Sequence, residues 1–292
     1  MIIKLVFVIF ICMAIFKVYI DNNLIEVLNY KIHSSKIPKE FNGFKILQIS
    51  DLHSKSFGKE NIDLINKVEA VEPNIIVITG DMVNNDFDYS SFISIVNKLT
   101  VKYKIYYVIG NHEQNVIARN PDEFNNMLKE IKEKNVSIIN NKNISISMGK
   151  QSINLYGMYT DLKYYRDFRN KASRSINFSV KDMEELIGKC DKNAYNLLLT
   201  HNPVFFSTYS KWGADLTLTG HVHGGMVKLP LLGGIFSPEY TLFPKYYEGI
   251  YKEYDNFMNV NRGLGRGNFG IRLFNRPELS VITLYSTRKY EV

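Results

Sequence analysis

The chain has 292 residues, of which 45% are hydrophobic, and this excludes a disordered chain that is too polar to bury a core. Its formal charge of +7 suits phosphate-bearing ligands or an anionic membrane surface, and by itself identifies neither. The two cysteines, Cys12 and Cys190, are too few for a disulfide framework or a cysteine-based metal site.

An uninterrupted apolar run, LVFVIFICMAIF, lies between Lys4 and Lys17. Apolar residues on both sides extend it toward the length that a helix needs to cross the roughly 30 Å hydrocarbon layer of a membrane. The run is apolar on every side, unlike a buried amphipathic helix, and no small-x-small cleavage site follows it. We therefore expect residues 1–21 to form an uncleaved transmembrane anchor.

After this run, strand-like apolar segments alternate with helical patterns, which predicts an α/β architecture. No linker, repeat or low-complexity stretch interrupts it, so residues 22–292 are expected to form one catalytic domain. A first strand should follow the anchor, and the remaining strands are predicted at residues 44–50, 74–79, 104–109, 196–200 and 215–219, with shorter β segments within 136–158. Helical periodicity favours helices at 59–72, 121–135 and 179–189, the last two capped by Asn120 and Ser179.

Polar motifs of one kind follow five of the predicted strands. They are Ser-Asp51-Leu-His53, Thr-Gly-Asp81, Gly-Asn111-His112-Glu113, Thr-His201-Asn-Pro and Gly-His221-Val-His223-Gly-Gly. Every histidine of the chain except His33 lies in one of them. Because ligands of α/β folds bind outside the carboxyl ends of the strands, we expect these side chains to gather at one edge of a sheet.

Carboxylate, carboxamide and imidazole groups without thiolate suit first-row divalent metals, namely Zn, Mn, Fe, Co or Ni. A pair of ions also needs a bridging oxygen donor, which a carboxylate can supply. Glycines in the motifs, such as Gly80, Gly110 and Gly220, leave room for tight turns close to the ions. The alternative is that these residues only cap helices and form turns; it explains the Asp, Asn and Gly residues but not the histidines.

The series D-x-H, G-D, G-N-H-E, H and G-H-x-H, in this order, resembles the calcineurin-like metallophosphoesterase superfamily. Two further features are similar to its membrane-associated bacterial branch of the YkuE type. They are His-Gly-Gly in the last motif and Arg262-Gly-Leu-Gly265 followed by IRLFNRPELSVITL. The resemblance implies a four-layer α/β/β/α sandwich behind the membrane helix, and a metal-dependent phosphoric ester hydrolase. It also favours a single-pass protein of the cell membrane with its catalytic domain on the outer face.

The same resemblance implies two divalent ions, most simply Mn, Zn or Fe, and a set of ligands for each. The ligands of one ion would be Asp51, His53 and His223. The ligands of the other would be Asn111, His201 and His221, with Asp81 bridging the pair.

His112 follows a predicted ligand, and the resemblance implies that it stays off the metals and contacts the phosphate or protonates the leaving group. Imidazole suits this role because its unperturbed pKa, about 6.5, lies near working pH. Glu113 is expected to orient His112, or else to be a solvated loop charge.

Substrate recognition is predicted only in outline. Phosphate-pairing cations are candidates in two groups, either of which could instead be a solvated face: Lys163, Arg166, Arg169, Lys171 and Arg174, and Arg262, Arg266, Arg272 and Arg276. The aromatic residues within 240–254 could line a lipid or sugar pocket or fill the core.

Our leading hypothesis is a membrane-anchored phosphoesterase acting on a phosphodiester, pyrophosphate or phosphomonoester, either a small molecule or a lipid-linked substrate. The alternatives are a nuclease of the same superfamily, against which the anchor argues, and a non-catalytic metal-binding surface protein.

Overall fold

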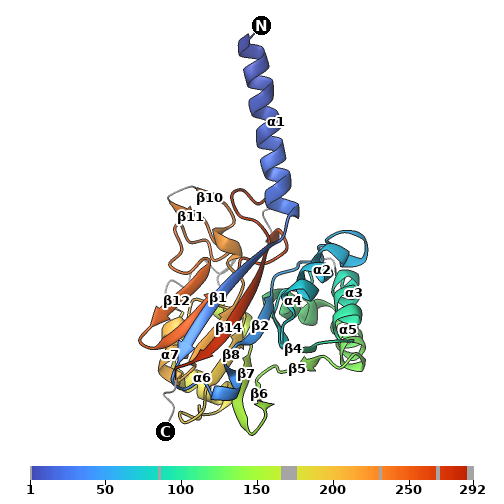
Figure 1. Ribbon diagram of the computed structural model, residues 1–292. Helices are drawn as coiled ribbons and strands as arrows, with labels where there is room; N and C mark the ends of the chain where they lie inside the picture. The colour runs from blue at the N-terminus through green and yellow to red at the C-terminus, as the bar shows by residue number, and fades with distance from the viewer. Residues whose placement is uncertain (1, 85–86, 166–175, 230–231, 268–269, 288–292) are drawn as a thin grey trace.

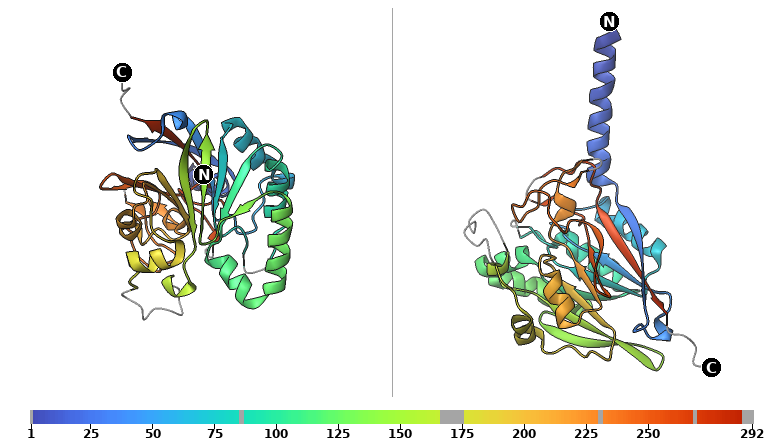
Figure 2. Two further views of the ribbon diagram at one scale, coloured as in Figure 1. Left: turned by 90° about the horizontal axis from the view of Figure 1, so that it is seen from below. Right: turned by 90° about the vertical axis from the view of Figure 1, so that its left-hand side faces the viewer.

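The computed structural model describes residues 2–84, 87–165, 176–229, 232–267 and 270–287. Two six-stranded mixed sheets face each other behind a long N-terminal helix (Figures 1 and 2). The first sheet has the strand order β1 (Glu26–Ser34), β14 (Glu278–Ser286), β2 (Phe44–Ile49), β3 (Ile75–Thr79), β4 (Lys104–Val108) and β5 (Ser137–Ile138). The second has the order β12 (Gly249–Glu253), β13 (Asn256–Val260), β9 (Leu216–Thr219), β8 (Asn196–Thr200), β7 (Gln151–Met158) and β6 (Lys142–Met148).

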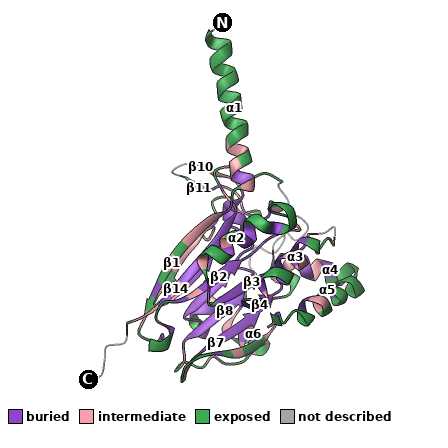
Figure 3. Cartoon of the chain, turned by 45° about the vertical axis from the view of Figure 1, so that its right-hand side comes forward, coloured by how far each residue is buried: buried purple, intermediate pink, exposed green. Residues whose placement is uncertain are grey.

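Helices cover the outer face of each sheet, so the fold is the expected α/β/β/α sandwich. The first sheet packs on α2 (Ile62–Val71), α3 (Ser90–Leu99) and α5 (Pro121–Glu133), and the second on α6 (Val180–Ile187) and α7 (Phe206–Trp212). Successive side chains of a strand point to opposite faces of its sheet, and this produces the layers. On β8, Leu197 and Leu199 face the space between the sheets, while Leu198 packs beneath the helices. The central strands are buried on both faces (Figure 3), which explains their continuous apolar runs.

Each predicted strand that precedes a polar motif is present, with bounds within one residue of those expected. Ser179 caps α6 as predicted, accepting a hydrogen bond from the Asp182 N–H. The predicted cap at Asn120 is wrong, because its side chain makes no capping hydrogen bond to α5. The sequence patterns also missed β12, β13 and β14. Strand β14 pairs parallel with β1 and antiparallel with β2, although it lies far from both along the chain.

The N-terminal helix α1 (Ile2–Asn23) projects away from the sheets (Figures 1 and 2). It is long and apolar enough to cross a membrane, and its apolar side chains are exposed rather than packed in a core. Its C-terminal end meets the rest of the protein, where Asp21 and Asn22 are buried.

A polar network is buried between the two sheets, just behind the ends of the strands. Gln48 on β2 donates from Nε2 to Thr79 Oγ1 and to the Thr219 carbonyl, both at 2.9 Å. Its Oε1 accepts from Asn259 Nδ2 at 2.8 Å. The side chain of one residue therefore joins β2 and β3 of the first sheet to β9 and β13 of the second, and fixes how the two sheets meet at this edge.

Gln48→Met is expected to destabilise the protein although methionine is apolar and of similar size. The Thr219 carbonyl would keep only the Asn261 N–H and Asn259 Nδ2 only Ser280 Oγ, so each would lose one of two buried hydrogen bonds, at about 0.5–1.5 kcal/mol for each bond. Denaturant unfolding would measure the change in the free energy of unfolding, with the partly exposed Gln151→Met at the start of β7 as the control. Equal stability of the two variants would contradict the role of the network.

Candidate metal centre

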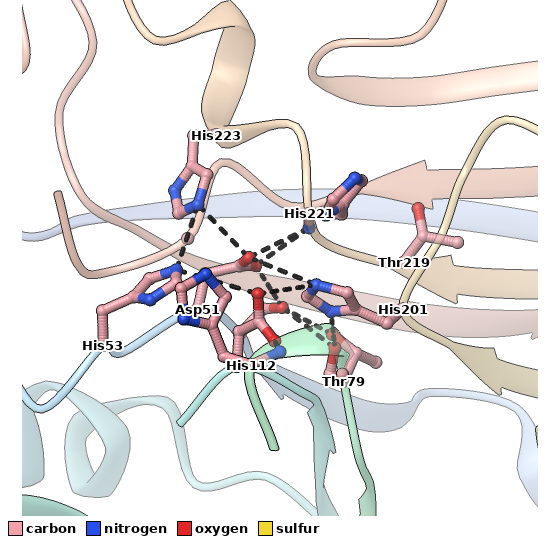
Figure 4. Close-up of polar contacts among 12 residues, drawn as sticks. Asp51, His53, Thr79, His112, His201, Thr219, His221 and His223 are labelled. Atoms are coloured by element: carbon pink, nitrogen blue, oxygen red, sulfur yellow. Dashed lines mark hydrogen bonds and ion pairs between the residues drawn. The ribbon is translucent and has the colours of Figure 1, made fainter. Parts of the chain in front are cut away.

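The polar motifs converge at the edge where the strands of both sheets end (Figure 4). Asp51 and His53 follow β2, and Asp81 follows β3. His201 follows β8, and His221 and His223 follow β9. Asn111 and His112 form the first turn of α4 (Asn111–Arg119), directly after β4. Residues from five separate stretches of the chain thus meet at this edge, and their carboxylate and imidazole groups lie in a small buried volume.

Two groups of candidate ligand atoms lie side by side. In the first, ligand atoms of Asp51, His53 and His223 are within 4.8 Å of one another. His53 Nε2 is 3.1 Å from His223 Nε2, which is 3.6 Å from Asp51 Oδ1. In the second, ligand atoms of Asp81, His201 and His221 are also within 4.8 Å of one another.

Short distances connect the two groups. His201 Nε2 lies 3.0 Å from Asp81 Oδ2 and 3.8 Å from Asp51 Oδ1. His53 Nε2 lies 3.9 Å from the same Asp81 oxygen. Asp81 is therefore the carboxylate that faces both groups. His112 also belongs to this cluster, because its ring lies within 4.8 Å of ligand atoms of His53 and Asp81.

The donor chemistry of these residues fits cations. His201 Nδ1 is 2.6 Å from the Thr79 carbonyl and so carries a proton, and Nε2, 3.0 Å from Asp81 Oδ2, is left to hold a second proton or to bind a metal ion. Among the described residues, the buried Asn111 Oδ1 has no hydrogen-bond partner. Acceptors that face one another in a buried site repel unless a proton or a metal ion lies between them. A divalent ion would satisfy them together.

The pKa shifts of these side chains have the same cause. Burial and neighbouring imidazoles hold the pKa of His53 and of His223 well below the usual value, so both rings are neutral and able to bind metal. Burial lowers the pKa of His201 as well, but the charges of Asp81 and Asp51 outweigh it and raise this pKa to about 10. A cation that binds beside Asp81 would therefore displace a proton.

A buried carboxylate that the sequence analysis missed contacts the centre. Glu239 Oε1 is 2.6 Å from His221 Nε2, and only 6% of the residue is exposed. This contact uses Nε2 of His221, so Nδ1 is the ring nitrogen that stays available to a metal ion. Glu239 lies in an irregular loop between β11 (Gly233–Gly234) and β12, where no spacing or motif distinguishes it from the other acidic residues.

Glu113 does not orient His112, and that expectation is wrong. The Glu113 carboxylate is fully buried and accepts backbone hydrogen bonds from Asp81 at 2.9 Å, Met82 at 2.6 Å and Gly110 at 2.8 Å. It therefore ties the loop after β3 to the start of α4. The interaction fixes the positions of Asp81 and of the helix turn that carries His112.

Three of the arginines proposed as phosphate-pairing groups have structural roles instead. Arg262 forms ion pairs with Glu278 and Glu26 at 2.6 Å and 2.7 Å. Arg272 is buried and donates to backbone carbonyls, and Arg276 donates to the carbonyl of Leu24. Arg262 and Arg276 use donors within the fold, and Arg272 does so with Nε and Nη2, while its buried Nη1 has no hydrogen-bond partner among the described residues.

Arg266 is exposed and lies beside the centre, because the neighbouring Gly267 packs against His223. Of the other basic group, Lys163 is exposed and lies 3.6 Å from Asp161. The remaining members, Arg166, Arg169, Lys171 and Arg174, lie outside the described residues. Of the four arginines in the C-terminal group, Arg266 remains the candidate to bind a phosphate of the substrate.

The aromatic residues within 240–254 differ in their exposure. Tyr246 and Tyr251 pack edge to face with ring centroids 4.9 Å apart and are partly buried against the core, which is one of the two expected roles. Tyr240 and Phe243 are 48% and 59% exposed.

The glycine loop 263–267 packs against the candidate ligands. A Cβ atom on Gly263 would lie 2.6 Å from Asp51 Cβ, and one on Gly265 would lie 2.8 Å from His53 Cβ. A Cβ atom on Gly267 would lie 3.0 Å from His223 Nε2. Only a chain without side chains at these positions can approach the centre so closely, which explains the Arg262-Gly-Leu-Gly265 motif physically.

Residues 44–225 match the model of the calcineurin-like phosphoesterase family. The chain belongs to this family. The metallophosphoesterase YkuE of Bacillus subtilis is 28% identical over 274 residues, which cover 92% of this chain and 88% of that protein. YkoQ of the same organism is 24% identical over 238 residues, covering 80% and 81%. The phosphodiesterase YaeI of Escherichia coli is 27% identical over 248 residues, covering 82% of each. The protein is therefore a metal-dependent phosphoric ester hydrolase.

Glu113→Ala is expected to disorganise the centre without removing any candidate ligand. Three buried backbone N–H groups would lose their acceptor, at about 1–3 kcal/mol each. Asp81 would shift, so the metal retained after dialysis should fall together with thermal stability. Elemental analysis and thermal unfolding would measure both, with the exposed Glu123→Ala as the matched control. Full metal content in the Glu113 variant would contradict this role.

Proposed function

We propose that this protein is a membrane-anchored phosphoesterase whose centre binds two divalent ions, Mn, Zn or Fe. The anchor is residues 1–21 and the catalytic domain residues 22–292. The observation that carries the proposal is that two groups of buried ligand atoms face each other across Asp81. When bound, the ions would offset charge on the phosphoryl oxygens and make a water acidic enough to attack at neutral pH.

The ligand assignment gives each ion its own set of residues and one shared carboxylate. One ion is assigned to Asp51, His53 and His223. The other is assigned to Asn111, His201 and His221, with Asp81 shared. Both carboxylates are oriented by the fold: Asp81 Oδ1 accepts the His112 N–H at 2.8 Å, and Asp51 Oδ1 accepts the His221 N–H at 3.0 Å.

His112 is proposed as the acid that protonates the leaving group. Its ring stands edge to face on His53, with centroids 4.5 Å apart, and its backbone N–H is held by Asp81. Within the described part of the chain, its Nδ1 has no hydrogen-bond partner. A ring fixed by packing, with an unused nitrogen at the centre, is suited to move a proton to a substrate oxygen.

The substrate is proposed to be a phosphodiester, pyrophosphate or phosphomonoester, with a lipid-linked molecule favoured because the enzyme carries an anchor. We place the catalytic domain on the outer face, because Lys4 would then lie on the cytoplasmic side of α1. The test is hydrolysis by the full-length, metal-loaded protein in detergent against monoesters, diesters, nucleotide-linked lipids and DNA. Cleavage of DNA alone would favour a nuclease, and an inert protein that retains its metals would indicate a non-catalytic role.

Asp81→Ala is expected to remove both ions, because it deletes the shared carboxylate. Elemental analysis after dialysis should find little metal in this variant. The matched control is Asp161→Ala, whose side chain is exposed. Loss of one ion and full retention of the other would overturn the bridging assignment.

His112→Ala is expected to retain both ions and to lose about 10²–10⁴-fold in kcat, the usual contribution of a positioned acid. The loss should be smaller for a substrate with a good leaving group such as p-nitrophenolate, which needs little protonation. Loss of metal from this variant would show instead that His112 is a ligand.

A further inference from the structure

The last turn of α1 is joined to the segment 271–276 by direct hydrogen bonds. Asn22 Nδ2 donates to the Arg272 carbonyl at 2.9 Å, and Asn22 Oδ1 accepts the Arg272 N–H at 3.0 Å. Asp21 Oδ2 accepts the Phe274 N–H at 2.6 Å. Asp21 and Asn22 are 0% and 4% exposed. The helix is therefore fixed to the catalytic part of the chain rather than tethered by a loose linker.

The same segment reaches the metal centre through Arg272. Its guanidinium is buried and donates to the carbonyls of Gly265, Arg262 and Gly263 at 2.7 Å, 2.8 Å and 3.1 Å. Gly263 and Gly265 belong to the glycine loop that packs on the candidate ligands, and Arg262 directly precedes it. One hydrogen-bonded layer thus connects the base of α1 with the metal centre. Both lie at the same edge of the first sheet, because the end of β2 pairs with the start of β14, which pairs with the start of β1.

Two further segments extend this layer away from α1. Lys228 N donates to the Leu273 carbonyl, Ile235 N to the Val227 carbonyl, and Phe243 N to the Ile235 carbonyl. The layer carries exposed apolar side chains, which we call the apolar rim: Leu232, Tyr240, Leu242, Phe243, Ile271 and Phe274. Each is between 42% and 65% exposed, an arrangement typical of a surface that meets a partner or a membrane.

The position of α1 decides between these two partners. The apolar run of α1 ends at Lys17, and the Lys17 ammonium lies 4.6 Å from the centroid of the Phe274 ring. A lysine that ends a membrane-spanning run lies at the level of the lipid headgroups. Because Phe274 belongs to the rim, the rim lies at this level too.

We propose that the apolar rim inserts into the membrane that holds α1, so that the metal centre acts on phosphate esters of membrane amphiphiles at the headgroup level. The inference about substrate rests on the proposed phosphoesterase function, whereas the inference about membrane contact does not. Binding of this kind lets the headgroup reach the metals while the acyl chains stay in the bilayer. It also holds the enzyme and its substrate on one surface at high effective concentration.

The membrane contact is tested with full-length protein in lipid vesicles. Phe243→Trp places a fluorophore in the rim, and brominated lipids should quench its added emission. Val101→Trp is the matched control, because Val101 is 86% exposed and precedes β4, at the end of the strands opposite the metal centre. The natural Trp212 is buried and adds the same background to both. Equal quenching at the two positions, or none at 243, would overturn the contact.

The substrate class is tested with the double variant Leu242→Ser, Phe243→Ser and the control Val101→Ser. We expect kcat/KM toward a phosphodiester lipid in vesicles to fall about tenfold in the double variant, since two large apolar side chains no longer enter the bilayer. Its kcat/KM toward soluble bis(p-nitrophenyl) phosphate should not change. An equal loss on both substrates would overturn the assignment of the rim.

The two experiments separate failure of this inference from failure of the proposed function. Quenching at position 243 by a protein that hydrolyses soluble esters and no membrane lipid would overturn the substrate class alone. A protein that hydrolyses no phosphate ester would overturn the proposed function, while the quenching result still decides the membrane contact. If brominated lipids do not quench the tryptophan at position 243 and the protein is a dimer in solution, the apolar rim would instead be assigned to contact with a second copy of the chain.

Discussion

The structure depends on holding together buried groups that repel one another. Two carboxylates and several imidazoles meet at one edge, with candidate ligand atoms 3–4 Å apart. In an apolar interior such a cluster is unfavourable without a cation or a proton among its members. Other interactions in the fold hold these residues in place. Metal binding would then relieve the repulsion that folding imposes on them.

Hydrogen bonds from buried side chains, many of them to the backbone, supply much of this restraint. The Glu113 carboxylate gathers three N–H groups around the loop of Asp81, and Gln48 joins the two sheets behind the strand ends. The glycine loop presses bare backbone against Asp51 and His53. Gln48, Glu113 and the glycine loop thus hold the candidate ligands in place together. None of these supporting residues needs to touch a substrate to influence the centre.

The same layer that covers the centre also receives the N-terminal helix. Arg272 donates to the glycine loop with its side chain and exchanges backbone hydrogen bonds with Asn22. In the proposed membrane-bound form, a helix held in this way would also set which side of the protein faces the lipid, and would place the metal centre near the headgroups.

The sequence alone determined the strands that end in polar motifs, the α/β class and the apolar helix, because each is a local pattern of neighbouring residues. Its motifs also pointed to the family, and through it to the sandwich fold and to metal chemistry. Tertiary structure decided the rest. The pairing of β14 between β1 and β2, the contact of Glu239 with His221 and the use of Arg262 and Arg272 within the fold all join residues distant in the chain. No periodicity marks such partners, since the free energy that selects them comes from burial and hydrogen bonds that exist only after the sheets have packed.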